Sequence, residues 1–129
     1  MNVLWLVEDS PNQLKRLESL LRDLEYEVHA FRNADELLEH ISDLPTPDAI
    51  VMDLALKVTS NGFQAAEKIR ALRPEISVEK FCFISGWKKQ FSPLTPNAFA
   101  DSEIIDKANW RLQDLQEALD HAINSQRTA

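Results

Sequence analysis

The sequence predicts an α/β protein with a doubly wound, five-stranded parallel sheet and helices on both of its faces. Short apolar segments alternate with amphipathic helical patterns along the chain, which is the order that a parallel sheet with crossover helices requires. Most of these apolar segments are continuous rather than alternating, as expected for strands that are buried on both faces. Prolines and capping residues mark the borders between the segments.

The five predicted strands are short, and most of them end next to a polar residue. They span residues 3–7, 26–31, 49–52, 81–84 and 103–106. The second of them alternates apolar and polar residues, which is typical of a half-exposed edge strand. This pattern places the second strand outside the first and favours the flavodoxin-like strand order 2-1-3-4-5.

Capping residues predict where the helices begin. Ser10 is the expected N-cap of the first helix, with a proline at the first helical position and Gln13 completing a capping box. Asn33 and Glu36 form the same pattern ahead of the second helix, and Asn109 is the expected N-cap of the last one. Apolar residues at helical spacing follow each start and predict one buried stripe per helix.

The third and fourth helical segments differ in their pattern. Residues 63–72 carry a regular apolar stripe, whereas residues 87–100 contain two prolines, so we expect a short or irregular fourth helix. Trp87, Phe91 and Phe99 in that segment have two interpretations. We favour the one in which they fill the core where a helix is missing; in the other they form an exposed docking surface.

Composition excludes several classes of function. The chain has 129 residues, with 14 Lys and Arg against 21 Asp and Glu, so its net charge is −7. This balance disfavours direct binding to nucleic acid or to an anionic membrane surface, and no apolar run is long enough to span a bilayer. The only two glycines, Gly62 and Gly86, leave no glycine-rich phosphate loop, and the single cysteine, Cys82, fits a reducing, cytoplasmic setting. We expect one domain over residues 1–125 and a short tail over 126–129.

Polar side chains and one glycine stand at the ends of four predicted strands. In chain order they are Glu8, Asp9, Asp53, Ser85, Gly86 and Lys107. In such sheets ligands bind beyond the carboxyl ends of the strands, so we expect these residues to meet in one pocket. The three carboxylates repel each other there, and a Mg²⁺ ion, which prefers oxygen ligands, would relieve the repulsion.

The same pocket suits an incoming phosphoryl group. Lys107 supplies a positive charge, Ser85 supplies a hydroxyl donor, and backbone N–H groups near Gly86 are further donors. Because no cysteine or histidine is expected in the pocket, a carboxylate is the favoured nucleophile, and Asp53 is the most central one.

This ordered set of residues resembles the receiver domain of response regulators of the CheY-like type, over residues 2 to about 125. The resemblance implies that Asp53 is the phosphoacceptor. It also implies that Asp9 and Asp53 bind Mg²⁺ directly, with Glu8 acting largely through water. The backbone carbonyl of Ala55 would be a further metal ligand.

The resemblance also implies the remaining roles and the partners. Lys107 would bind the phosphoryl group, Ser85 would turn inward to a phosphoryl oxygen, and Gly86 would keep the access route small. The donor would be a phosphohistidine on a sensor histidine kinase or on a histidine phosphotransfer protein. Phosphorylation would then change the affinity for an unidentified downstream protein, without the multiple turnover of an enzyme.

The sequence departs from the pattern of this family at several positions. Ala108 stands where the family usually has proline, so we expect a trans peptide bond or a shifted loop there. Ile104 replaces a frequent aromatic residue, so an aromatic rotamer switch is absent or altered. The loop after Asp53 has Lys57 near the position of the usual proline, and it is one residue longer before Gly62.

Two other functions stay open at this point. The chain could be a receiver-like interaction module that does not use phosphate, which the departures around the fourth helix and fifth strand favour. It could also be a metal-dependent phosphatase or other hydrolase with an aspartyl nucleophile. Against the latter, Ala55 occupies the position where a general acid would be expected, two residues after Asp53, and the chain has no room for a substrate-capping domain.

Overall fold

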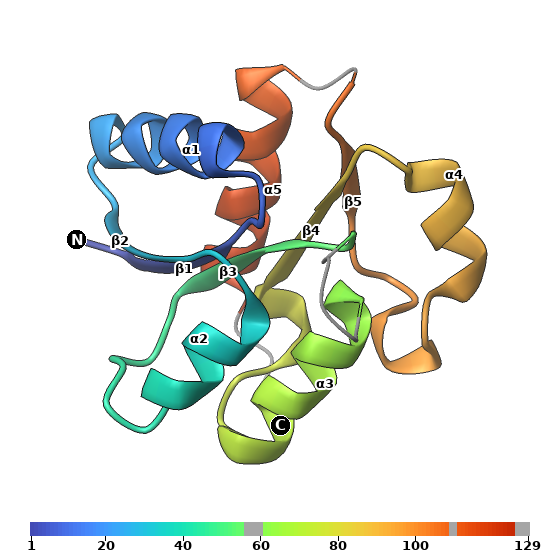
Figure 1. Cartoon of the computed structure of the whole chain (residues 1–129), viewed down its shortest axis with the longest axis horizontal. Helices are drawn as coiled ribbons and strands as arrows, with labels where there is room; N and C mark the ends of the chain where they lie inside the picture. Colours follow the sequence, from blue (N-terminus) through green and yellow to red (C-terminus); the bar gives the residue numbers. More distant parts are fainter. Residues whose placement is uncertain (56–60, 109–110, 126–129) are drawn as a thin grey trace.

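A single parallel sheet forms the centre of the protein (Figure 1). The structure is a computed structural model, which describes residues 1–55, 61–108 and 111–125. The strand order is β2-β1-β3-β4-β5, as the sequence predicts. The strands are β1 (Val3–Val7), β2 (Glu27–Phe31), β3 (Ala49–Asp53), β4 (Phe81–Ser85) and β5 (Ile104–Asp106). The outer strand β2 is partly exposed, whereas every residue of β3 and β4 is buried, so the predicted difference between edge and central strands is confirmed.

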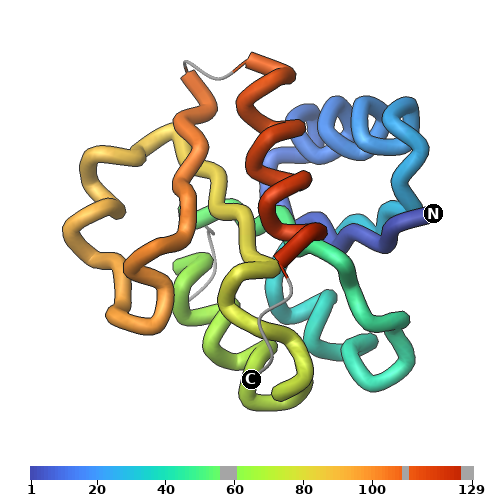
Figure 2. The backbone as a smooth tube through the Cα atoms, turned by 180° about the vertical axis from the view of Figure 1, so that it is seen from behind, coloured from blue at the N-terminus to red at the C-terminus, as the bar shows by residue number. Residues whose placement is uncertain are grey.

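Helices cover both faces of this sheet. They are α1 (Pro11–Asp23), α2 (Ala34–His40), α3 (Gly62–Leu72), α4 (Lys88–Phe91) and α5 (Leu112–Asn124). Helices α1 and α5 lie on one face and α2 and α3 on the other, which Figure 2 shows from behind. Short 3₁₀ turns complete the described elements as η1 (Val78–Lys80), η2 (Ser92–Leu94) and η3 (Asn97–Phe99). None of the helices in the described ranges has the length and apolarity that a membrane span needs.

The sheet separates two hydrophobic clusters. One lies under α2 and α3 and contains Trp5, Ile50 and Phe83, while the other lies under α1 and α5 and contains Leu6 and Val51. Residues of a strand alternate between the two clusters because successive side chains point to opposite faces of a sheet. The continuous apolar runs of the sequence are therefore explained by burial on both sides.

The helix starts follow the sequence only in part. Ser10 has the extended backbone of an N-cap, but its side chain makes no capping hydrogen bond within the described range 1–55, so the predicted capping box with Gln13 is wrong. The physical reason is that the Ser10 N–H, which Gln13 would need, donates instead to Oε1 of Glu8 at 3.3 Å. For α2 the capping half of the prediction is confirmed, because Asn33 Oδ1 accepts from the Glu36 N–H at 2.8 Å.

The last helix begins at Leu112. The predicted N-cap Asn109 lies outside the described residues, as does Lys57 in the loop after β3. At the start of α5 the Arg111 N–H donates to Oδ2 of Asp114 at 2.8 Å. Peptide bonds in the described ranges are trans, including the one that precedes Ala108, as expected.

The segment between β4 and β5 is irregular, as its prolines predict. The helix α4 has four residues and is followed by the 3₁₀ turns η2 and η3. Phe99 is fully buried and Phe91 packs against the same cluster, which confirms the core interpretation for these two residues. Trp87 is 59% exposed, so for this residue the core interpretation is wrong. The segment thus contributes one deep aromatic anchor and leaves its first aromatic side chain in solvent.

Candidate metal and phosphoryl site

The carboxyl ends of four strands bring the predicted polar residues together. Glu8 directly follows β1, Asp53 ends β3, and Lys107 directly follows β5. The Lys107 Nζ lies 2.7 Å from Oε2 of Glu8 and 3.1 Å from Oδ2 of Asp53. Carboxylate oxygens of Glu8, Asp9 and Asp53 all lie within 4.8 Å of one another. Residues that are up to 99 positions apart in the chain therefore share one site.

Burial controls the electrostatics of this site. Glu8 is 0% exposed and Asp53 is 1% exposed. Burial, followed by repulsion from Glu8, raises the pKa of Asp53 to about 7, although Lys107 and the Ala55 N–H oppose the change. Burial alone would lower the pKa of Lys107, but its hydrogen bonds and charge interactions with Glu8 and Asp53 outweigh burial and raise it. One ammonium group thus faces more negative charge than it can neutralise.

The acidic residues fit a divalent cation. Asp9 Oδ2 is buried, and none of the described residues donates a hydrogen bond to it. An unpaired buried acceptor is costly, and a hard cation between the carboxylates would satisfy it. Asp53 Oδ1 accepts from the Ala55 N–H at 3.0 Å, which holds the Ala55 backbone next to the same carboxylate. Both oxygens of Glu8 are already engaged, with the Ser10 N–H and with Lys107, which suits contact with a metal through water.

Ser85 lies at the end of β4, next to this cluster. It is fully buried, and its Oγ accepts from the Trp87 N–H at 2.9 Å. Its carbonyl accepts from the Lys107 N–H at 2.9 Å, so the backbone ties Ser85 to the residue that carries the site's positive charge. Because a hydroxyl can accept and donate at once, Ser85 can also donate a hydrogen bond to an anionic ligand.

The two glycines occupy very different surroundings. A Cβ added at Gly86 would meet no atom of the described residues within 4 Å, so there is space for a side chain at this position. A Cβ added at Gly62 would lie 2.4 Å from the carbonyl oxygen of Asp53, far inside contact distance. Sequence reasoning treated Gly62 only as the end of a longer loop. Its rarity, as one of two glycines in the chain, and its place at the start of a predicted helix were the available signals.

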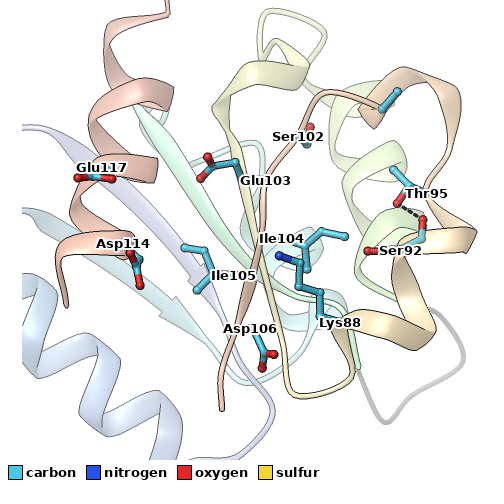
Figure 3. Close-up of a pocket in the computed structure, with 11 residues that line it drawn as sticks. Lys88, Ser92, Thr95, Ser102, Glu103, Ile104, Ile105, Asp106, Asp114 and Glu117 are labelled. Carbon is cyan, nitrogen blue, oxygen red and sulfur yellow. Dashed lines mark hydrogen bonds between the residues drawn. The ribbon is translucent and has the colours of Figure 1, made fainter. Parts of the chain in front are cut away.

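A separate groove of about 700 Å³ runs along the outer edge of β5. Figure 3 shows Lys88, Ser92 and Thr95 on its α4 side, where the Thr95 Oγ1 donates to the Ser92 carbonyl at 2.8 Å. Glu103, Asp114 and Glu117 occupy the α5 side. None of the three clustered carboxylates lines this groove, so it belongs to the irregular segment and not to the acidic site.

Comparisons with known proteins agree with this architecture. A family model described as the response regulator receiver domain matches residues 4–120. Curated proteins yield no sequence match. Among solved structures, the response regulator protein TrrA from Thermotoga maritima, crystallised in complex with Mg²⁺-BeF, is 17% identical with a TM-score of 0.74, and the match covers 95% of this chain and 99% of that one.

Two further solved structures have the same fold. A response regulator receiver protein from Sinorhizobium medicae is 21% identical with a TM-score of 0.78, over 98% of this chain and 97% of that one. The receiver domain of a sensor histidine kinase from Pseudomonas aeruginosa has a magnesium ion in its active-site cleft. It is 23% identical with a TM-score of 0.76, over 96% of this chain and 98% of that one. The family model covers nearly the whole described fold, including β1, β3, β4 and β5 with the clustered residues at their ends, and the chain belongs to the response regulator receiver domain family.

Proposed function

We propose that this receiver domain accepts a phosphoryl group on Asp53 from a phosphohistidine of a sensor histidine kinase or of a histidine phosphotransfer protein. Asp9 and Asp53 would hold Mg²⁺ directly, the Ala55 carbonyl would be a further ligand, and Glu8 would act through water. The observation that carries the proposal is the buried Oδ2 of Asp9, which lies beside the Asp53 carboxylate and accepts no hydrogen bond from the part of the chain that the structure describes. A buried acidic cluster of this kind requires a cation that the protein itself supplies only in part, through Lys107.

Asp53, Lys107 and Ser85 have separate roles in the proposed phosphoryl transfer. A carboxylate oxygen of Asp53 bonds to phosphorus while the bond between phosphorus and the donor imidazole breaks. The electron pair of that bond stays on the imidazole nitrogen, which takes up a proton from solvent. Lys107 can move its ammonium group from Asp53 Oδ2 to a phosphoryl oxygen, and Ser85 can donate its hydroxyl to another. A bound Mg²⁺ would supply positive charge that favours the ionised form of Asp53 and neutralises the phosphoryl oxygens.

The proposal extends to a switch in partner binding. The TrrA structure holds Mg²⁺-BeF and the Pseudomonas receiver domain holds magnesium, which supports a metal-assisted site in this chain as well. Phosphorylation would shift the population toward a conformation with a different affinity for a downstream protein. We place this reaction in the cytoplasm and regard the domain as a phosphoryl acceptor without multiple turnover.

Intact-mass measurement after incubation with acetyl phosphate tests the proposal. We expect the wild-type chain to gain one phosphoryl group with Mg²⁺ present and to gain none in EDTA. Asp53→Asn should stay unlabelled, whereas Asp23→Asn, which changes an exposed carboxylate on α1, should label like the wild type. A wild-type chain that stays unmodified with Mg²⁺, or equal labelling of Asp53→Asn, would exclude phosphorylation at this residue.

A second candidate function is a receiver-like interaction module that ignores phosphate. The irregular segment after β4, with its exposed Trp87 and Leu94, favours this alternative because it differs from a regular fourth helix. The two functions differ in one measurable property. If Asp53→Asn and Asp53→Ala leave signalling in the cell unchanged, the module binds its partner without phosphate.

A further inference from the structure

Gly62 makes an unusually close approach to the backbone of the proposed phosphoacceptor. It is the first residue of α3 and is buried. A Cβ at this position would lie 2.4 Å from the Asp53 carbonyl oxygen, 3.0 Å from the Asp53 carbonyl carbon and 2.9 Å from the Leu54 Cα. Its φ lies outside the left-handed region, so the need for glycine here is purely a matter of space.

Hydrogen bonds hold the same stretch of backbone from several sides. The Gly62 N–H donates to the Leu54 carbonyl at 3.0 Å, and the Leu54 N–H donates to the Ile84 carbonyl of β4 at 2.9 Å. The Ala55 N–H donates to Asp53 Oδ1 at 3.0 Å. Any displacement of the Asp53–Leu54 peptide therefore moves the Asp53 carboxylate and the Ala55 backbone together, and these are two of the three groups proposed to contact the metal directly.

Helix α3 is held in place at its start and along its buried face. Asn61 Oδ1 accepts from the Gln64 N–H at 2.9 Å, and Gln64 Oε1 accepts from the Asn61 N–H at 3.0 Å, so a reciprocal capping box fixes its start. Phe63 and Ile69 of the same helix are buried in the cluster under α2 and α3. Interiors packed in this way transmit a shift to their neighbours instead of absorbing it.

We propose that Gly62 is a positioning residue of the phosphorylation site, which sets where the Asp53 carboxylate and the Ala55 carbonyl stand relative to the metal. It touches neither metal nor phosphoryl group and acts through the Asp53–Leu54 peptide. The inference rests on the proposed function. It adds that the geometry of the site depends on the first residue of α3 and not only on the residues at the strand ends. A side chain at position 62 thus changes the geometry of the site even where the fold survives.

Calorimetric Mg²⁺ titration of the full chain carrying Gly62→Ala tests this role. We expect Mg²⁺ to bind at least roughly tenfold more weakly than to the wild type, the size seen when groups that orient metal ligands are altered. Labelling of Asp53 by acetyl phosphate should also be slower in this variant than in the wild type. The titration is made at a temperature where circular dichroism shows the variant to be folded, with sucrose added if needed to keep it folded.

Two control variants separate positioning from stability. Ala71→Ser adds one atom to an exposed side chain near the other end of α3, so its Mg²⁺ affinity should equal that of the wild type. Ile69→Val removes a buried methyl group from α3 away from Asp53, so it should lower the melting temperature and leave the Mg²⁺ affinity unchanged. Wild-type Mg²⁺ affinity in folded Gly62→Ala would overturn the inference, and so would failure of that variant to fold in sucrose, because Gly62 would then serve the fold. Failure of the wild type to bind Mg²⁺ would instead reject the proposed function itself.

Discussion

The acidic site and the segment between β4 and β5 are ordered by different means. At the site, the side chains of Glu8 and Asp53 are almost completely buried, and hydrogen bonds from the Ala55 N–H and from Lys107 hold them. In the segment, one buried ring, Phe99, anchors a chain whose Trp87 and Leu94 are 59% and 60% exposed. The comparison teaches that the site depends on the ends of the sheet, whereas the segment depends on a single aromatic cluster. Changes in one region should therefore leave the other largely intact, except where Ser85 joins them.

The largest effect is expected at the aromatic anchor. The Phe99 ring meets Phe81 and Phe83 edge-on, with centroid distances of 5.6 and 5.3 Å. It stacks on Phe63 at a centroid distance of 6.3 Å. Phe99→Ala should lower the free energy of unfolding in urea by about 3–5 kcal/mol, because it leaves a cavity in the core. Trp87→Ala, in the same segment, should change it by less than about 0.5 kcal/mol. Similar losses for the two variants would contradict the division of this segment into anchor and exposed part.

Removal of the site's own cation comes next. Lys107→Ala leaves Glu8 and Asp53 buried without their counter-ion, so in EDTA at pH 8 we expect a loss of about 3 kcal/mol in unfolding free energy. Saturating Mg²⁺ should restore a large part of this loss, because a cation then returns to the cluster. Lys68→Ala, on the exposed face of α3, is the control and should be nearly neutral. A loss in Lys107→Ala that Mg²⁺ leaves untouched would argue against a shared site.

The dependence of stability on pH isolates Asp53. Its pKa in the folded protein is about 7, above its ordinary value of 3.8, so folding favours the protonated form. This stabilisation is complete below about pH 4 and is lost as the pH rises toward 7. In EDTA, urea unfolding of the wild type should lose roughly 2 kcal/mol between pH 5 and pH 8 relative to Asp53→Asn, which cannot titrate there. Parallel pH profiles for the two proteins would show that Asp53 is already ionised at pH 5.

The smallest effect is expected at the junction of the two regions. Ser85→Ala removes the acceptor of the Trp87 N–H, which lies near solvent, so unfolding free energy should fall by about 1 kcal/mol. Amide NMR shifts should change for residues that follow β4, with little change at Asp9. Extensive shift changes at Asp9 in the metal-free variant would mean that the site and the segment are coupled more tightly than this one hydrogen bond allows.

The arrangement of the site could be predicted because it follows from strand topology. Once Val3–Val7 and the other apolar runs are strands of a parallel sheet, their carboxyl ends must meet, and Asp53 and Lys107 come together. The capping box at Ser10 could not be predicted correctly, because Glu8 competes for the same N–H only in the folded chain. The close approach of Gly62 to Asp53 could not be predicted, because it depends on the distance between α3 and β3; the sequence shows only that Gly62 is one of two glycines and stands at the start of a helix.

For the segment after β4, the sequence predicted the irregular backbone but not the packing of the side chains. Its prolines predicted an irregular helix, which the structure confirms. Which aromatic side chain enters the core depends on where the chain turns between residues 91 and 99, and that turn is set by packing against Phe63 and Phe83 of distant elements. The sequence pattern therefore could not distinguish the three aromatic residues of this segment, although their surroundings in the structure differ.

The hydrogen bond between Ser85 and Trp87 gives the protein a built-in optical reporter. Trp87 follows Ser85 by two residues, and its backbone N–H donates to the Ser85 hydroxyl, while its side chain is exposed. Trp5 is instead fully buried, and its indole N–H donates to the Pro45 carbonyl at 3.2 Å. Emission from Trp87 should lie at longer wavelength than emission from Trp5, and it should be quenched more readily by acrylamide. In a Trp110→Phe variant, which removes the third tryptophan of the chain, occupancy of the site could then be followed without a label by the emission wavelength and quenching of Trp87.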